Sequence, residues 1–212
     1  MCCKLMAQLK RLEGLADYES TWQAMKTFTE NRQPDTENQI WQVEHPPVYT
    51  LGQAGKPEHV LNPGKIPVVR CNRGGQVTYH GPGQVVIYPL INLHRANMFV
   101  KEYVTALEDA IIHTLNDYGI SQACRKDGAP GVYVPMENGE LAKIAALGVK
   151  VSRGCTYHGL AINVDMDLSP FDGINPCGYA ELKTIDMKTV GAKASWQEVA
   201  DKVSGYLMEV FA

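Results

Sequence analysis

The sequence of 212 residues lacks the usual signatures of nucleotide, metal and membrane binding. No glycine pair is followed by Lys-Ser or Lys-Thr as in a P-loop, and no G-x-G-x-x-G fingerprint follows a strand. No cysteines stand in C-x-x-C spacing, which argues against a structural zinc site. No apolar run approaches the roughly 18 residues of a membrane span. We therefore expect no metal, no bound cofactor and no membrane segment.

The chain also lacks an excess of charge of one sign. It has 20 Lys and Arg against 23 Asp and Glu, a net charge of −3, which gives no support for nucleic-acid binding. Its start shows no signal peptide, because Gln8, Lys10 and Arg11 interrupt it before a long apolar stretch forms. We expect a cytoplasmic protein with free thiols, in which residues 1–212 form a single domain.

Hydrophobic periodicity predicts three helices. Apolar residues repeat at three and four positions from Phe99 to Tyr118, where Gly119 ends the pattern. Ser195-Trp196-Gln197-Glu198 reads as a capping box before a second helix. Residues 18–29 place Tyr18, Trp22, Met25 and Thr29 along one face of a third.

Short β-rich stretches bounded by Gly or Pro fill the space between these helices. The predicted strands are Gln39–Glu44, Val48–Leu51, Val68–Cys71, Gln76–His80, Gln84–Leu90, Gly131–Pro135, Ile144–Ser152 and His158–Val164. Helices and strands do not alternate strictly, which predicts an α+β (mixed α/β) domain with a largely antiparallel or mixed sheet flanked by helices. Residues 165–181 are rich in Asp, Pro and Gly and predict an irregular loop.

Glycine surrounds the residues that could carry chemistry. The tetrapeptide T-Y-H-G occurs twice, at 78–81 after Arg73-Gly74-Gly75 and at 156–159. Because glycine allows backbone to approach a ligand closely, or supplies amides to an oxyanion, these stretches suggest a binding site rather than a core. A histidine after tyrosine in a strand is also often purely structural. His80 and His158 therefore remain candidates for a supporting role, and His45, in a rigid turn, for the pocket edge.

Cys177 is the candidate nucleophile. A lone cysteine is ordinarily a small buried apolar residue, but Pro176 and Gly178 place this one at a backbone kink. A free thiol with a pKa of about 8.5 is mostly protonated at neutral pH, so it needs a nearby cation. Lys143 precedes the apolar run 144–147, where burial would lower the pKa of its amine. A lysine poised between ammonium and amine suits both thiolate stabilisation and acid/base work.

Four ordered motifs carry a resemblance to a known family. They are R-G-G-Q-V-T-Y-H-G-P-G-Q from Arg73, G-A-P-G-V-Y-V from Gly128, K-I-A-A-L-G-V-K-V-S-R-G-C-T-Y-H-G-L-A-I-N-V from Lys143, and L-S-P-F-D-G-I-N-P-C-G-Y from Leu168. Together with H-P-P-V-Y-T-L-G from His45 they resemble the octanoyltransferase family of lipoate assembly, over about residues 44–179.

The resemblance implies a fold similar to the catalytic domain of biotin and lipoate protein ligases. It also implies transfer of an octanoyl group from acyl carrier protein to a lysine on lipoyl domains of 2-oxoacid dehydrogenases and on the glycine cleavage H protein. The acyl-thioester cysteine of the family falls on Cys177, and its pKa-lowering lysine on Lys143. The implied substrate-binding residues are Arg73, Gly74, Gly75, Gln76, Val77, Thr78, Tyr79, His80, Ala146, Leu147, Gly148, Gly159, Leu160 and Ala161.

Two further expectations concern the substrates. The acyl tail requires an apolar slot, for which the candidates are Tyr79, Tyr157, Leu147, Val77 and Ile162, with room left by Gly75 and Gly148. An acidic carrier protein requires a local positive rim, for which the candidates are Arg70, Arg73, Lys150 and Arg153.

Three alternatives stay open from the sequence. An ATP-dependent lipoate or biotin ligase of the same fold needs no P-loop, and it also needs no Cys177. A non-catalytic module would bind acyl carriers without transferring the acyl group. A cysteine hydrolase using Cys177 and His158 would release free fatty acid without an acceptor lysine.

Overall fold

The computed structural model describes residues 7–176 and 182–211. Six strands form the large sheet in the order β1-β2-β6-β9-β8-β7, and three short strands form a second sheet in the order β4-β3-β5. The strands are β1 (Gln8–Leu15), β2 (Gln39–Glu44), β3 (Val48–Leu51), β4 (Val68–Arg70), β5 (Val77–His80), β6 (Gln84–Leu90), β7 (Gly131–Pro135), β8 (Leu141–Ser152) and β9 (Cys155–Asn163).

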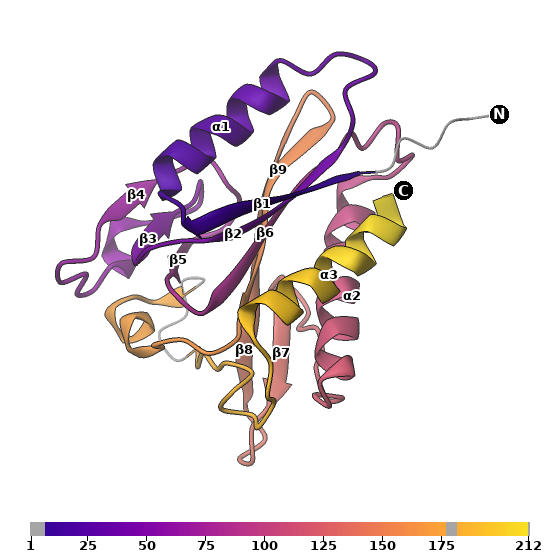
Figure 1. The fold of residues 1–212 in the computed structure, drawn as a ribbon. Coiled ribbons are helices and arrows are strands. Elements are labelled where there is room, and N and C mark those ends of the chain that lie inside the picture. The colour runs from indigo at the N-terminus through magenta and orange to yellow at the C-terminus, as the bar shows by residue number, and fades with distance from the viewer. Residues whose placement is uncertain (1–6, 177–181, 212) are drawn as a thin grey trace.

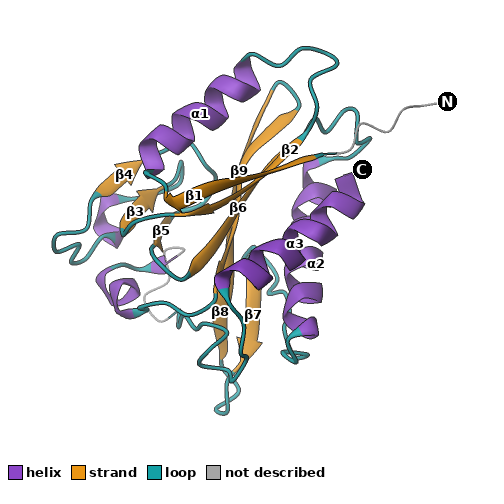
Figure 2. Cartoon of the chain, in the orientation of Figure 1, coloured by secondary structure: helices purple, strands orange, loops and turns teal. Residues whose placement is uncertain are grey.

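Helices cover both faces of the large sheet. Helix α1 (Tyr18–Glu30) lies on one face, and α2 (Val100–Asp117) and α3 (Trp196–Phe211) lie side by side on the other (Figure 1). Leu107 and Ile111 of α2 and Leu207 of α3 are fully buried in the larger core, against Ile87 and Ile162 of the sheet. The opposite face of the sheet packs a smaller core against α1. Two short 3-10 turns, Pro57–His59 and Ser169–Gly173, complete the elements (Figure 2).

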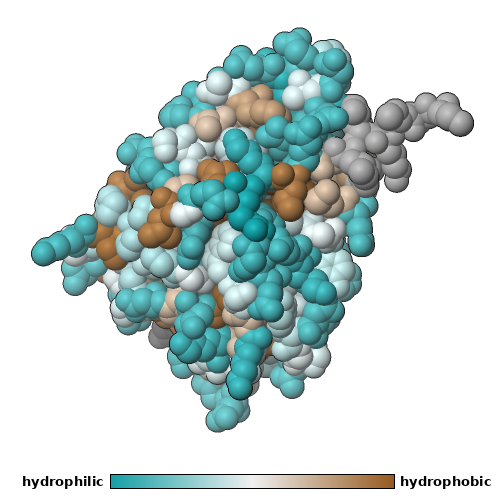
Figure 3. Space-filling model, in the orientation of Figure 1, coloured by the Kyte–Doolittle hydropathy of each residue, from teal (hydrophilic) through white to brown (hydrophobic). Residues whose placement is uncertain are grey.

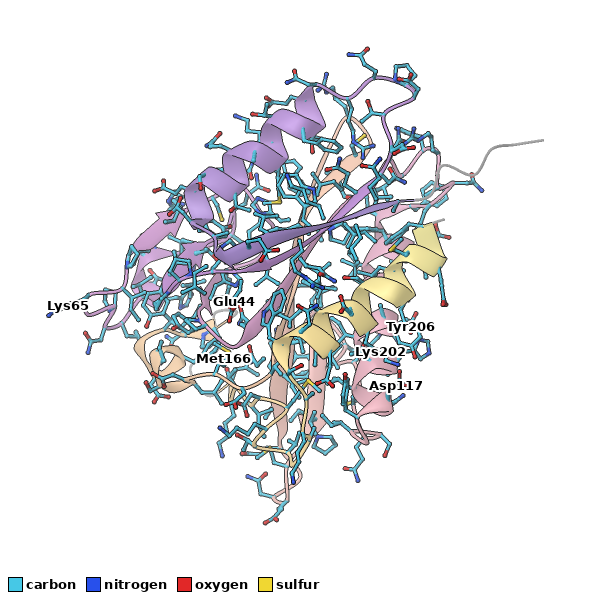
Figure 4. The ribbon with its side chains drawn as sticks, viewed as in Figure 1. Glu44, Lys65, Asp117, Met166, Lys202 and Tyr206 are labelled. Atoms are coloured by element: carbon cyan, nitrogen blue, oxygen red, sulfur yellow. The ribbon has the colours of Figure 1, made fainter. Side chains whose placement is uncertain are left out.

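Local sequence signals set the ends of the two packed helices. The Ser195 hydroxyl accepts from the Glu198 amide at 3.2 Å, and the Glu198 carboxylate accepts from the Ser195 amide at 2.8 Å, which confirms the capping box. Asp117, the last residue of α2, accepts hydrogen bonds from Lys202 and Tyr206 in the middle of α3 at 3.1 and 2.8 Å (Figure 4). The exposed contacts orient the helices, while burial of their apolar faces stabilises the pair.

The hairpin of β8 and β9 is the longest in the sheet. Its turn residues Arg153 and Gly154 have φ of 49° and 74°, so both central positions of a two-residue turn are left-handed. Such a turn matches the right-handed twist of the strands, and Gly154 adopts this φ without steric cost. The turn fixes a register in which Gly148 faces Gly159 and Ala146 faces Ala161. This hairpin becomes the floor of the site described below.

The α+β expectation with a mostly antiparallel sheet is confirmed, with two differences in the elements. Strand β1 was not predicted; it pairs in parallel with β2 at the sheet edge, and its mostly exposed residues give no alternating pattern. The loop predicted at 165–181 contains the 3-10 turn Ser169–Gly173. The face in view is largely hydrophilic, with apolar residues gathered across its middle near β1, where Leu9 and Leu15 are about half exposed (Figure 3).

Candidate active site

A cavity lies where the second sheet and α1 meet the β8–β9 hairpin. We call it the hairpin pocket; its empty space is about 710 Å³, a volume that includes the open solvent at its mouth. It is lined by Tyr18, Arg73, Gly75, Gln76, Val77, Thr78, His80, Gln84, Val86, Tyr88, Lys143, Ala146, Leu147, Gly148, His158, Gly159, Leu160, Ala161, Asn163, Phe171 and Thr184.

The small residues of the hairpin shape the floor. A Cβ on Gly159 would stand 2.2 Å from the carbonyl oxygen of Ile87, so glycine allows β9 to approach β6 closely. A Cβ on Gly148 would stand 3.0 Å from Cδ of Arg73 and 3.2 Å from the oxygen of Gly74. The segment that begins at Arg73 therefore lies directly on the floor at Gly148, and the amide of Gly74 donates to the oxygen of Val149 at 2.9 Å.

Lys143 lies at one end of the floor and is 5% exposed. Its ammonium donates to the carbonyl oxygen of Pro130 at 3.2 Å and lies 5.0 Å from the centre of the Tyr133 ring, a cation–π contact. Its backbone pairs with the segment at Thr184: the Lys143 amide donates to the oxygen of Lys183 at 2.8 Å. The apolar run after Lys143 thus does what its sequence suggested, by holding the amine at a buried position beside the pocket.

Cys177 lies outside the described residues, which stop at Pro176 and resume at Leu182. Pro176 and Leu182 line a second depression together with Ala142 and Thr184. Ala142 precedes Lys143 in β8, and Thr184 lines both this depression and the hairpin pocket. Pro176 and Leu182, the nearest described residues before and after this gap, therefore lie beside the Lys143 end of the floor.

Three buried histidines lie close together beside the pocket, and two of them, His80 and His158, line it. Burial lowers the pKa of His45 to about 4 and of His80 and His158 to about 3, because a buried imidazolium lacks the hydration that stabilises its charge in water. His45 donates from Nδ1 to the oxygen of Ala16 at 2.6 Å and its Nε2 accepts from the Tyr88 hydroxyl at 2.7 Å. His45 thus supports Tyr88 from behind and does not line the pocket.

Arg73 is buried and its guanidinium is used inside the fold. It donates to the oxygen of Thr50 at 2.5 Å, to the Thr50 hydroxyl at 2.8 Å and to the oxygen of Gly74 at 2.9 Å. Its assignment to a docking rim was therefore wrong, since it is only 6% exposed. Arg153 is exposed, but its guanidinium donates to the oxygen of Glu30 at the end of α1. Arg70 is exposed and Lys150 half-buried, so both remain rim candidates.

The structure brings together most of the predicted binding residues. Gly74, Tyr79 and His45 are the ones that do not line the hairpin pocket. Tyr79 packs in a satellite core, with its ring 5.5 Å from that of Phe171. Of the other proposed slot residues, Val77 and Leu147 line the pocket, whereas Ile162 lies in the core on the opposite face of the sheet.

Sequence reasoning missed several residues of the lining. Tyr18, Val86, Tyr88, Asn163, Phe171 and Thr184 come from elements far apart in the chain. Gln84 closes the first glycine motif and could have been found there. Its amide donates to Asn163 Oδ1 at 2.9 Å, and its Oε1 accepts from His80 Nδ1 at 2.7 Å, so it orients a pocket imidazole.

The mixed sheet, with a pocket between its central hairpin and a smaller sheet, is compared with the folds and sequences of known proteins. The family described as "Lipoyl protein ligase A/B catalytic domain" matches residues 17–207, and the chain belongs to this family. The octanoyltransferase of Bordetella pertussis is 60% identical over 199 residues, covering 94% of this chain and 90% of its own. That of Albidiferax ferrireducens is 53% identical over 227 residues, covering 95% and 98%.

Solved structures show the same fold at low identity. A bipartite lipoate protein ligase from Thermoplasma acidophilum has a TM-score of 0.78 at 15% identity, covering 97% of this chain and 84% of its own. Biotin protein ligase from Aquifex aeolicus has a TM-score of 0.55 at 12% identity, covering 97% and 68%. The expected likeness to lipoate and biotin ligases is confirmed, and with it the resemblance to octanoyltransferases, which makes this chain an acyltransferase.

No helix in the described part of the chain is long and apolar enough to cross a membrane. Within residues 7–176 and 182–211, no three His, Cys, Asp or Glu side chains come together in a way that could hold a metal ion.

Proposed function

We propose that this chain transfers an octanoyl group from octanoyl-acyl carrier protein to a specific lysine of lipoyl domains, through a thioester on Cys177. The acceptors are lipoyl domains of 2-oxoacid dehydrogenases and the glycine cleavage H protein, and the reaction belongs to cytoplasmic protein lipoylation. The observation that carries the proposal is the buried amine of Lys143 at one end of the hairpin pocket, next to a depression lined by Pro176 and Leu182.

In the first half-reaction the Cys177 thiolate attacks the thioester carbonyl. The carrier's pantetheine sulfur leaves, and the Lys143 ammonium gives it a proton. A group whose pKa lies near the operating pH performs this transfer best, and a buried lysine can reach that range. The products are acyl-Cys177, neutral Lys143 and the free thiol of the carrier.

In the second half-reaction the incoming lysine must lose its charge, since its free pKa is about 10.4. Neutral Lys143 takes that proton, and the resulting amine attacks the acyl-Cys177 carbonyl. The amide nitrogen releases its second proton to solvent, and Cys177 leaves as a thiolate beside the restored ammonium of Lys143. A thioester becomes an amide, which is downhill, so the cycle needs no ATP. Two partners acting in turn on one covalent carrier predict ping-pong kinetics.

The test of the thioester is intact-mass analysis after mixing the protein with octanoyl-acyl carrier protein. Wild type should gain one octanoyl group and lose it on addition of a lipoyl domain, whereas Cys177→Ser should gain none. Cys124→Ser is the matched control, since Cys124 is a partly exposed free thiol outside the pocket, and it should behave as wild type. An acyl group retained in Cys177→Ser would reject the assignment.

Lys143→Met tests the acid/base role separately. It keeps the length of the side chain and removes the amine, so transfer should fall by about 10²–10⁴-fold. The fold should survive, because methionine fills the same space at this buried position. Unchanged transfer by a correctly folded Lys143→Met would remove Lys143 from the mechanism.

The likeness to a lipoate-protein ligase A bound with ATP supports one second candidate, an ATP-dependent ligase. Such an enzyme activates free acid as an adenylate and does not require Cys177. Incubation with ATP and octanoate, followed by a search for octanoyl-AMP, separates the two reactions. We expect none to form.

A further inference from the structure

His158 takes an unusual backbone conformation that turns its ring into the hairpin pocket. Along β9, Leu160 and Ile162 face the core under α2 and α3, and strict alternation would place residue 158 with them. Instead His158 has φ of 58°, uncommon for a residue with a side chain. Its ring lies 6.3 Å from Trp22 and 6.2 Å from Tyr88, on the α1 face of the sheet. Strain of this kind persists where the surrounding structure holds it, and it gathers at functional sites.

The hydrogen-bond network decides which ring nitrogen of His158 carries the proton. The indole N–H of Trp22 can only donate a hydrogen bond, and it lies 3.0 Å from Oδ1 of Asn72. This contact fixes the orientation of the Asn72 amide, with its oxygen toward Trp22. The Asn72 nitrogen donates to the Tyr157 hydroxyl at 2.6 Å, in agreement. His158 Nε2 lies 3.0 Å from the same Oδ1 and must therefore be the donor. In the neutral ring Nδ1 then has a bare lone pair.

That lone pair has no partner in residues 7–176 and 182–211, although Nδ1 is buried and the His158 side chain lines the pocket. The residue as a whole is 1% exposed. A buried acceptor left unpaired costs free energy, so the arrangement favours a ligand that brings a donor. The other pocket imidazole has both of its partners: His80 donates from Nδ1 to Gln84 Oε1 at 2.7 Å, and its Nε2 accepts from the Thr50 hydroxyl at 3.4 Å.

The unpaired acceptor of His158 lies at the end of the pocket away from Lys143. His158 pairs with Val149, six residues beyond Lys143 on β8, or about 20 Å along the strand. The Lys143 side chain extends along this path, since its Cε would meet a Cβ on Gly131, which pairs with Ala146. The three residues from the level of Ala146 to that of Val149 span about 10 Å. An extended octanoyl chain spans about 9 Å, so its methyl end stops just short of His158. Chains of about twelve carbons would span about 14 Å and approach it.

We propose that the inner end of the hairpin pocket is an acceptor subsite for a hydroxyl group carried at the far end of an acyl chain, with Nδ1 of His158 as the acceptor. The substrate class is ω-hydroxyacyl thioesters. An unsubstituted chain long enough to reach the subsite leaves the lone pair unpaired, whereas a terminal hydroxyl satisfies it. His158 is thus a specificity-determining residue for long chains. This inference rests on the proposed function for the position of the reacting end.

The test compares carrier thioesters of 8, 10 and 12 carbons with and without a terminal hydroxyl. In wild type the hydroxyl should raise kcat/KM about tenfold at the length that reaches the subsite. His158→Phe keeps a ring without a lone pair, and His158→Asn suits the left-handed backbone but is too short to reach, so both should lose this preference. His113→Phe, at an exposed position on α2, is the matched control and should keep it.

Nitrogen NMR provides a readout that needs no transfer. In Cys177→Ser protein the Nδ1 resonance of His158 should shift on addition of 12-hydroxydodecanoic acid and should not shift with dodecanoic acid. A hydroxyl that lowers kcat/KM at all three lengths in wild type would overturn the proposal, as would a preference that survives in both His158 variants. Wild type that forms no octanoyl adduct at all would instead refute the proposed function, because the NMR result does not depend on it.

Discussion

The three buried histidines predict that the protein loses stability steeply in mild acid. His45, His80 and His158 have pKa values of about 4, 3 and 3 in the folded protein, while an unfolded chain has histidines near 6.5. Because the unfolded state binds more protons below pH 6.5, stability is full above that pH and is lost as the pH falls toward the folded values. The cause is burial, since each ring is at most 6% exposed.

The size of the effect follows from proton counting. Each histidine that is charged only in the unfolded chain contributes a slope of 1.36 kcal/mol per pH unit, so three give about 4 kcal/mol per unit near pH 5. Integrated from pH 7.5 to pH 5, the loss is about 6 kcal/mol, comparable with the whole stability of many domains. Asp17 and Asp201, carboxyls of lowered pKa, add a loss of the same sign only closer to pH 4.

The assay is urea unfolding followed by fluorescence at half-unit intervals from pH 7.5 to pH 5. His158→Asn should lower the slope by about a third, because one titrating ring is gone. His113→Asn, at an exposed position on α2, is the matched control and should follow wild type. A slope below about 1.4 kcal/mol per unit in wild type would mean that the rings take up protons within the fold, and it would refute the reasoning.

Three further predictions concern single positions. Gly83→Ala should lower the free energy of unfolding, measured in urea, by more than about 3 kcal/mol, because φ is 85° and a Cβ would stand 1.9 Å from a backbone oxygen. Gly139→Ala is the control: its φ is 82° but its surroundings are open, so it should lower that free energy by only about 1 kcal/mol. Equal losses of unfolding free energy in the two variants would show that the positive φ alone, and not the close contact at Gly83, sets the cost. Gly148→Leu must push Arg73 aside, so it should shift acyl preference toward shorter chains and melt earlier than wild type; an unchanged chain-length profile would contradict this. Arg73→Lys should lower the free energy of unfolding by about 2 kcal/mol, since an ammonium cannot make the several hydrogen bonds of the guanidinium to Thr50 and Gly74. Thermal melts that show no loss of stability would mean that those hydrogen bonds do not stabilise the fold.

Much of the fold could be predicted because its signals are local. The helix of residues 100–117 follows from its apolar repeat, and the start of α3 from the Ser195 capping box. Six predicted strands match observed strands within a residue, and the other two, Ile144–Ser152 and His158–Val164, begin three residues late. Strand β1 was not predicted because an exposed edge strand needs no alternation of apolar and polar residues. Only its pairing with β2 in the structure identifies it as a strand.

The site divides in a similar way. Lys143 and the glycine-rich stretches could be found because their residue types are unusual in sequence, and most of the latter line the hairpin pocket. The burial of Arg73 could not be predicted, since an arginine in a polar, glycine-rich segment normally lies in solvent. The role of Asn72, which fixes the tautomer of His158, depends on partners from α1 and β9.

The sequence by itself determined the secondary structure, the family and the residue types of the chemistry, because periodicity, turn residues and ordered motifs are properties of neighbours along the chain. Only the tertiary structure decided which polar groups meet in the pocket and in which protonation state. Burial and hydrogen-bond partners arise from elements up to some hundred residues apart, and they set the neutral rings of His80 and His158 and the buried amine of Lys143.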